Sequence, residues 1–149
     1  MTGKWLLGMT FATLLMGCEV PVMIAAEQNQ GKMTGIFEIT FPAVLLVRTD
    51  DGDEELLRGE LIGHANGSAR FALDGPTWGH CTGTSTKAGT TTMQCAEGVD
   101  FTMETGRQKA KMSGINVSNG TFEGTAFVSA FGWGNDASEA AVRAALAES

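Results

Sequence analysis

Three cysteines and two histidines are the residues of this chain best suited to covalent, metal-binding or acid–base chemistry. Two of the cysteines, Cys81 and Cys95, flank a stretch centred on Lys87-Ala88-Gly89. If these three residues form a hairpin loop with Gly89 in the left-handed conformation, the two strands pair symmetrically about Ala88. Cys81 then lies directly opposite Cys95, close enough for a disulfide. The spacing therefore predicts a structural disulfide between Cys81 and Cys95.

A metal site and a redox-active pair are the alternatives for these two cysteines, with His64 and His80 as further metal ligands. Because His80 and Cys81 are adjacent, their side chains would point to opposite faces of a strand. The chain also has no Cys-x-x-Cys or His-x-His spacing. Both alternatives stay open, but the disulfide is favoured, and no metal or other cofactor is predicted.

A hydrolase with His64 or His80 as its base is a further class of function. The sequence contains no Gly-x-Ser-x-Gly elbow, no phosphate-binding loop and no His-Glu-x-x-His motif. We therefore predict no catalytic residue and expect the chain not to be an enzyme.

The third cysteine, Cys18, ends an apolar run that follows the single charged residue Lys4. Residues 5–16 are too short to span a bilayer of about 30 Å, and their length is typical of the apolar part of a secretory signal. The run closes with Leu15-Met16-Gly17-Cys18, which resembles the bacterial lipobox. The resemblance implies cleavage before Cys18, a diacylglycerol on its thiol and an acyl chain such as palmitate on its new amino group. Residues 1–17 are then the signal peptide.

The lipobox resemblance also implies a place for the protein in the bacterial cell envelope. Residues 18–32 become a lipid-anchored N-terminus and tether, since residues 27–32 are polar. Because Glu rather than Asp follows Cys18, the resemblance favours the outer membrane, with the protein facing the periplasm. Two other outcomes stay open: a transmembrane helix over residues 5–26, and ordinary cleavage after residue 26 that releases a soluble protein.

Acidic residues outnumber basic ones, and the net charge of the whole chain is −7. Because the sequence has no basic stretch, nucleic acid is not an expected partner. Attraction to an anionic lipid surface is not expected either, so the lipid alone would hold the protein on the membrane. Twenty glycines and no tyrosine, together with many Ser and Thr residues, are typical of an all-β domain with tight turns.

Turn dipeptides divide residues 33–149 into short and evenly spaced strand candidates. Asp51-Gly52, Asn66-Gly67 and Asn119-Gly120 each predict a two-residue hairpin turn. Two-residue turns at these places predict which residues lie opposite one another on the paired strands. These pairs are Val47 with Leu56, Arg48 with Glu55 as an ion pair, Ile62 with Phe71, Val117 with Phe122, and Ile115 with Gly124. The spacing predicts a mainly β fold: an antiparallel meander of eight or nine strands that forms a small barrel or a rolled sheet.

A short C-terminal helix over residues 136–148 is expected to complete a single domain of residues 33–149. Asp136 with Glu139 resembles a capping box at its start. The apolar side chains of this helix form a narrow stripe of Val142, Ala145 and Leu146. The helix should therefore lie across the sheet or across one end of the barrel.

The glycine-spaced strands around the cysteines resemble part of many small uncharacterised lipoproteins of Gram-negative bacteria. The residues that carry this resemblance are Phe71-x-Leu73-x-Gly75, Gly79-x-Cys81-x-Gly83 and Cys95-x-x-Gly98. The expected function is a lipid-anchored envelope protein with a non-enzymatic binding or structural role, whose partner is an envelope protein or a glycan. The alternative is a carrier of a small apolar ligand in a β-barrel lumen. It requires that the lumen is not filled by side chains such as Ile62, Phe71, Phe101 and Phe127.

Overall fold

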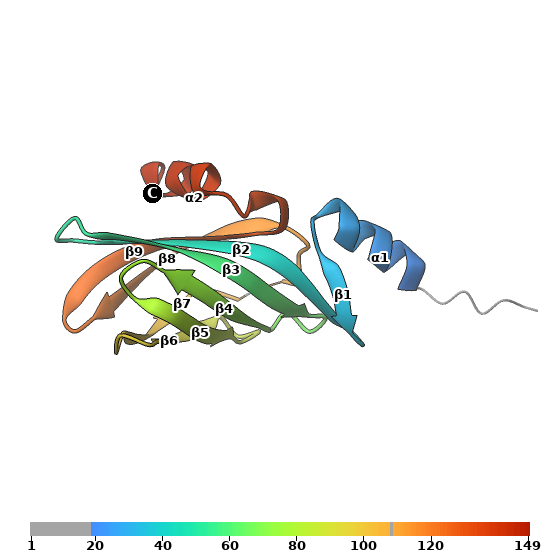
Figure 1. Ribbon diagram of the computed structural model, residues 1–149, viewed down its shortest axis with the longest axis horizontal. Helices are drawn as coiled ribbons and strands as arrows, with labels where there is room; N and C mark the ends of the chain where they lie inside the picture. The colour runs from blue at the N-terminus through green and yellow to red at the C-terminus, as the bar shows by residue number, and fades with distance from the viewer. Residues whose placement is uncertain (1–18, 108) are drawn as a thin grey trace, which may run out of the picture.

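The computed structural model describes residues 19–107 and 109–149, so Cys18 and the predicted signal peptide, residues 1–17, lie outside the described residues. This part of the chain is built mainly of strands, with a helix near each end (Figure 1). In chain order the elements are α1 (Glu19–Gln28), β1 (Lys32–Gly35), β2 (Glu38–Thr49), β3 (Glu54–His64), β4 (Ala69–Gly75), β5 (Gly79–Ser85), β6 (Thr90–Cys95), β7 (Asp100–Glu104), β8 (Gly114–Phe122), β9 (Thr125–Trp133), the 3-10 helix η1 (Gly134–Asp136) and α2 (Glu139–Ala147).

The strands form one antiparallel sheet in the order β7-β6-β5-β4-β3-β2-β9-β8, with β1 paired to β2 beside this path. Because β9 returns to pair with β2, the sheet curls into a nearly closed barrel of eight strands. The seam lies between β7 and β8, where Asn116 Nδ2 donates a hydrogen bond to the carbonyl of Thr105 at 3.2 Å. The predicted fold class, a mainly β meander with a C-terminal helix, is confirmed.

Four hairpins of the barrel share a three-residue loop that ends in a left-handed glycine: Gly52, Gly67, Gly89 and Gly98, with φ of 90°, 88°, 103° and 81°. The three-residue loop predicted at residues 87–89 is confirmed, and Cys81 lies directly opposite Cys95. The two-residue turns predicted at Asp51-Gly52 and Asn66-Gly67 are wrong, because the glycine takes the third loop position in both.

The extra loop residue shifts the pairing of β2 with β3 by one position. Val47 lies opposite Glu55 and not Leu56, and Arg48 pairs with Glu54 at 2.8 Å. On the next hairpin, Leu61 and not Ile62 lies opposite Phe71. Because successive strand residues face opposite sides, a slip of one position exchanges the inner and outer faces. Glu55, predicted to form a cross-strand ion pair with Arg48, is therefore buried inside the barrel instead.

The turn predicted at Asn119-Gly120 is also wrong, because both residues lie within β8. The chain reverses instead at Glu123-Gly124, where both residues have positive φ, 48° and 80°. Val117 therefore lies opposite Ala130, and Ile115 lies opposite Gly132. The absence of a side chain at Gly120 has a packing role, since a Cβ there would overlap the ring of Phe127.

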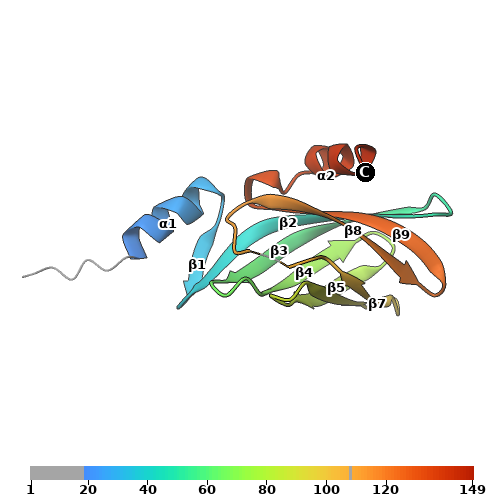
Figure 2. The same ribbon diagram turned by 180° about the vertical axis from the view of Figure 1, so that it is seen from behind.

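Strand β2 is buried on both faces, which explains its uninterrupted apolar run. Leu45 and Val47 point into the barrel, whereas Val44 and Leu46 point outward beneath α2. Figures 1 and 2 show α2 lying across the outer face of β2 and β9. The predicted position of the C-terminal helix across the sheet is therefore confirmed.

Helix α2 begins later than the sequence predicts. Its N-cap is Ser138, whose hydroxyl accepts the backbone N–H of Ala141 at 3.1 Å. Asp136 lies in the preceding η1 turn, so the predicted capping box of Asp136 and Glu139 is wrong. Ser138 takes the cap because it is extended immediately before the first helical residue, as a capping hydroxyl must be. The apolar stripe itself is confirmed: Val142 and Leu146 are buried.

Arginine–glutamate pairs tie α2 to the barrel. Arg143 contacts Glu54 of β3 at 2.7 Å and Glu139 of its own helix at 2.9 Å. Arg58 of β3 reaches Glu139 at 2.7 Å. Hydrogen bonds from Arg143 and then from Arg48 hold the pKa of Glu54 below its ordinary value of 4.5, and the hydrogen bond from Arg143 does the same for the pKa of Glu139.

The attachment of α2 should weaken in acid, and Arg143→Met should remove part of this pH dependence. A carboxyl whose pKa is lower in the folded state stabilises that state above the unfolded pKa and ceases to do so as pH falls through the folded pKa. We expect Arg143→Met to lower the melting temperature slightly at neutral pH, since exposed ion pairs contribute little. The gap to the wild type should shrink below about pH 4.5. Thermal melts of both proteins across this range measure it, and a constant gap would contradict the assignment.

The predicted tether of residues 18–32 is ordered from Glu19 onward. Residues 19–28 form α1, and β1 begins at Lys32. Ala26 of α1 is buried, and Asn135 Nδ2 donates a hydrogen bond to the Gln28 carbonyl at 3.0 Å. The C-terminal end of α1 is thus fastened to the chain just after β9, whereas its N-terminal part projects from the barrel.

Candidate ligand pocket at the open end of the barrel

The two ends of the barrel differ. We call the end at which β2, β4, β6 and β8 begin the mouth, and the opposite end the far end. Helix α1 and the β1–β2 hairpin lie at the mouth, whereas the β2–β3 and β8–β9 hairpins project at the far end (Figures 1 and 2). The far end is packed solid, and the mouth leads into a pocket.

Aromatic side chains fill the far half of the lumen. The rings of Phe101 and Phe127 meet edge to face with their centroids 4.9 Å apart. The ring centroid of Trp78 lies 6.0 Å from that of Phe101 and 6.5 Å from that of Phe122. Such aromatic contacts add to the apolar burial that holds a core together. The far half of the barrel is therefore part of the hydrophobic core.

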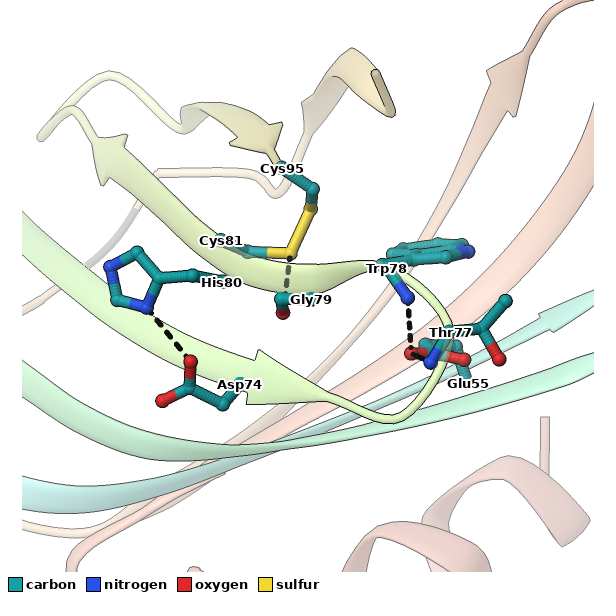
Figure 3. Close-up of a disulfide and its surroundings, with 8 residues drawn as sticks. All are labelled: Glu55, Asp74, Thr77, Trp78, Gly79, His80, Cys81 and Cys95. Atoms are coloured by element: carbon teal, nitrogen blue, oxygen red, sulfur yellow. Dashed lines mark hydrogen bonds and ion pairs between the residues drawn. A yellow bond between two sulfur atoms is a disulfide. The ribbon is translucent and has the colours of Figure 1, made fainter. Parts of the chain in front are cut away.

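The disulfide between Cys81 and Cys95 lies beside this aromatic cluster (Figure 3). The two sulfur atoms are 1.96 Å apart, and the two Cα atoms are 4.0 Å apart. Cys81 is buried in the lumen, whereas the neighbouring His80 points to the outer surface, as the alternation of a strand predicts. The bond joins β5 to β6 at the far end and has a structural position, away from the mouth.

A buried carboxylate shapes the loop that leads into the disulfide strand. Glu55 Oε1 accepts the backbone N–H groups of Thr77 and Trp78 at 2.8 and 2.9 Å (Figure 3). Burying a charge is costly unless it is hydrogen-bonded, and two N–H donors compensate part of that cost. Glu55 therefore acts as a structural acceptor that holds the β4–β5 loop over the far end.

The mouth half of the lumen contains a pocket of about 490 Å³. Its volume lies in the range of sites that take one small molecule. Most of the wall is apolar, with contributions from nearly every strand and from α1. The apolar side chains that line it are Val22, Met33, Ile36, Phe37, Ile39, Phe41, Leu45, Leu61, Phe71, Met103, Met112, Phe131 and Trp133.

The four side chains that the sequence suggested as filling the lumen take different positions in the structure. Phe101 and Phe127 fill the far half. Phe71 lines the mouth pocket and leaves it open. Ile62 does not face the lumen, because the one-residue register shift turns Leu61 inward and Ile62 outward. The condition set by the sequence for a ligand-binding lumen is met in the mouth half.

One side of the pocket carries a polar stripe along the seam. Ser118 and Ser129 are buried there, and the Ser129 hydroxyl donates to the carbonyl of Ser118 at 3.4 Å. Thr91 donates to the Ser85 hydroxyl at 3.0 Å. Every buried side-chain nitrogen or oxygen among the described residues has a hydrogen-bond partner. The stripe is therefore satisfied within the protein, and its hydroxyls could still accept a weakly polar group of a ligand.

Two lysines of the β7–β8 segment lie among the residues at the entrance. Lys109, Lys111 and His64 line it, and no carboxylate is found among the described residues of the pocket wall. The indole N–H of Trp133 donates to the Lys111 carbonyl at 3.0 Å, which holds the β7–β8 segment against the mouth. The pocket thus combines an apolar interior with a positively charged entrance.

The two histidines lie apart on the fold. His64 Nδ1 is 3.5 Å from Glu38 at the mouth, and His80 Nδ1 is 2.8 Å from Asp74 on the outer surface. Neither contact includes a serine, threonine or cysteine that could act as a nucleophile. No group of three or more metal-ligating side chains occurs in residues 19–107 and 109–149. Nothing in this arrangement supports the hydrolase or the metal alternative.

Reasoning from sequence named a ligand-binding lumen as an alternative but did not identify most of the residues that line the pocket. Its walls are formed by strand residues that look like ordinary core positions in the sequence, such as Leu45, Leu61 and Phe71. Gly63 is the nearest to a signal: it follows the inward-facing Leu61 at the strand period and places no side chain in the lumen. A Cβ at Gly63 would have only ordinary contacts, 3.7 Å from Leu61 and 3.8 Å from Phe41.

Comparisons with known proteins do not identify a family. No protein-family model, no curated protein and no solved structure matches the chain. Within the part of the chain that the structure describes, no helix is long and apolar enough to cross a membrane. The pocket and its surroundings are therefore the features that bear most directly on function.

Proposed function

We propose that this protein binds one small amphiphilic molecule in the mouth half of its barrel, as a carrier in the bacterial cell envelope. The observation that carries the proposal is the apolar pocket of about 490 Å³ in a barrel whose other half is tightly filled. Empty apolar space is costly in a protein interior, because the surrounding side chains lose contacts. A ligand that fills the space would recover them.

The chemistry of the wall selects the ligand class. An apolar tail matches the interior, and an anionic or polar head matches Lys109 and Lys111 at the entrance. A fatty acid or a lysophospholipid has this combination. A sugar or a nucleotide would leave many polar groups unpaired against the apolar wall, at a cost for each.

The location in this proposal follows from the lipobox-like residues. Cys18 carries the lipid, the signal peptide of residues 1–17 is removed, and the domain faces the periplasm from the outer membrane. The anchor would keep a carrier of amphiphiles next to a membrane that contains them. An envelope protein or a glycan as partner, the first expectation from sequence, finds no equally specific feature in the structure.

Energy transfer from Trp133 tests the proposal, since this indole lines the pocket. In residues 19–149 the Trp78→Phe variant leaves Trp133 as the one tryptophan. A fatty acid with a dansyl head group should bind saturably, receive energy from Trp133, and be displaced by oleate or lysophosphatidylglycerol. Binding that does not saturate, or that these competitors do not displace, would refute a lumen site. Unmodified residues 19–149, followed by dansyl emission alone, control for the Trp78 substitution.

A further inference from the structure

Large apolar side chains are exposed mainly at the mouth. Of the eight such residues in the described chain, two, Ile115 and Val117, lie on β8. The other six belong to α1 and to the β1–β2 hairpin, which lie together at one end (Figures 1 and 2). We call these six the apolar rim: Val20, Val22, Met23, Ile24, Ile36 and Phe37. An exposed apolar cluster of this kind marks an interaction surface.

The tip of the β1–β2 hairpin is the most exposed part of the rim. Ile36 and Phe37 are 84% and 74% exposed, and Phe37 has a φ of 62°. A bulky residue is unfavourable in this left-handed conformation, which favours glycine. The barrel's other tight hairpins place glycine in it, and the β8–β9 hairpin adds Glu123 beside Gly124. An aromatic side chain kept at an exposed, strained position indicates a function outside the fold itself.

Helix α1 is apolar on more sides than packing requires. Ala26 faces the protein and is buried, whereas Val20, Met23 and Ile24 face solvent. A helix that is apolar on several sides is normally covered by protein or by lipid. Asn135 fastens the C-terminal end of α1, and Val22 of α1 lines the same pocket as Ile36 and Phe37 of the hairpin.

Charge is distributed unequally between the two ends of the barrel. The loops at the mouth contain Lys87, Arg107, Lys109 and Lys111, with Asp136 as their acidic residue. The adjoining ends of helix and strands add Lys32 and the acidic residues Glu27, Glu38 and Glu104. The loops at the far end contain Asp50, Asp51, Asp53, Glu97 and Glu123 and no basic residue. The net negative charge conceals this polarity, which would turn the mouth toward an anionic surface. The fold thus gathers most of the loop lysines at the mouth, whereas the loops of the far end are acidic.

We infer that the apolar rim docks on a phospholipid bilayer, with Ile36 and Phe37 inserted below the head groups and the lysines of the mouth at the anionic surface. Residue 18, the proposed lipidation site, is bonded to the first residue of α1, so an anchor there would hold the rim at the membrane at high effective concentration. The pocket would then open toward the bilayer. This docking goes beyond the proposed carrier function and does not require that the pocket holds a ligand.

A second copy of the chain fits the rim less well than a bilayer does. A two-fold contact through the rim would bring the same surface of both copies together. Lys109 and Lys111 of one copy would then face the same residues of the other, and like charges at an interface are unfavourable. An anionic bilayer offers apolar and negatively charged groups at the same time.

Flotation of residues 19–149 with vesicles measures docking in the absence of the lipid anchor. Vesicles of phosphatidylglycerol and phosphatidylcholine should carry the protein upward, and vesicles of phosphatidylcholine alone should carry less of it. The variant Ile36→Ser/Phe37→Gly should reduce the partition constant at least about tenfold, since two apolar side chains no longer insert. Its melting temperature should be equal or higher, because glycine suits the positive φ at position 37.

Two further variants show whether flotation depends on the rim, on exposed apolar side chains in general, or on the pocket. Val117→Ser removes an exposed apolar side chain from β8 and should float like the wild type. Gly63→Phe narrows the pocket and leaves the rim intact, so it should also float, whatever the fate of ligand binding. The inference is overturned if the wild type does not float or if the rim variant floats equally well. It is also overturned if sedimentation shows a dimer that the rim variant dissociates.

Discussion

Replacing Gly63 by phenylalanine is expected to weaken binding of the dansyl fatty acid at least about tenfold, which corresponds to about 1.4 kcal/mol. The backbone of Gly63 does not have positive φ, so a side chain can be accommodated there without strain. Its Cβ would lie 3.7 to 3.9 Å from its neighbours, at ordinary contact distances, and would extend toward the pocket. The ring would then occupy space that the ligand needs. Titration of the probe gives the affinity of each variant.

Gly63→Ala is the matched control for this prediction. One methyl group takes little of the 490 Å³, so Gly63→Ala should bind the probe nearly as well as the wild type. Both variants should melt near the wild-type temperature, because no existing contact is removed. Equal affinity of Gly63→Phe and the wild type would place the probe outside the barrel, even if vesicle docking through the rim persisted.

Loss of the disulfide is expected to be the largest single effect on stability. The bond closes a loop with a sequence separation of 14 residues, for which chain entropy predicts a stabilisation of about 3 kcal/mol. Cys81→Ala/Cys95→Ala should therefore lower the free energy of unfolding by about 3 kcal/mol and the melting temperature by roughly 10 °C. Urea denaturation measures the first quantity and a thermal melt the second.

Reduction of the wild type is the control for the double alanine variant. A reductant should destabilise the wild type by a similar amount and leave the variant unaffected, since the variant has no bond to break. Thiol titration of unfolded residues 19–149 should detect free thiols only after reduction. A free thiol in the unreduced protein, or a variant as stable as the wild type, would contradict the bond between Cys81 and Cys95.

These two predictions concern opposite ends of one barrel. The disulfide, Glu55 and the ring cluster of Phe101 and Phe127 hold the far end together. The mouth keeps unfilled space and exposes apolar side chains, both of which are costly to stability. A stable far end permits an open mouth in a small domain. Substitutions at the far end should thus change stability more than ligand affinity. Substitutions at the mouth should change ligand affinity more than stability.

Hairpin registers show how far local sequence predicts this fold. The sequence predicts the opposition of Cys81 and Cys95 correctly because a loop of three residues, Lys87-Ala88-Gly89, joins their strands. The loops at Gly52 and Gly67 have the same geometry, but an Asp or Asn before glycine also suits a two-residue turn. A one-residue slip would bring Leu56 and Ile62 inward in place of Glu55 and Leu61. Apolar burial alone does not select the observed register, in which the buried Glu55 accepts the backbone N–H groups of Thr77 and Trp78.

The sequence offered a ligand-binding lumen as an alternative, but the place of the pocket within the barrel could not be predicted from it, for a physical reason. Some lumen-facing side chains touch other side chains, and some face empty space. The sequence cannot tell the two apart, because both are apolar residues that recur at the same strand period. Phe127 fills the far half and Phe71 lines the pocket, although both are apolar strand residues. Their difference depends on which strands cross above them, and this is set by pairings far apart in the chain.

Local sequence was sufficient for the antiparallel meander, for the C-terminal helix with its stripe of Val142 and Leu146, and for the opposition of Cys81 and Cys95. These features depend on turn residues and on residue periodicity, which act over a few positions. Three others depend on the closed barrel: Glu55 is buried, the lumen is half empty, and basic and apolar groups share the mouth. Closure of the barrel produces all three, because it brings together side chains that no local pattern connects.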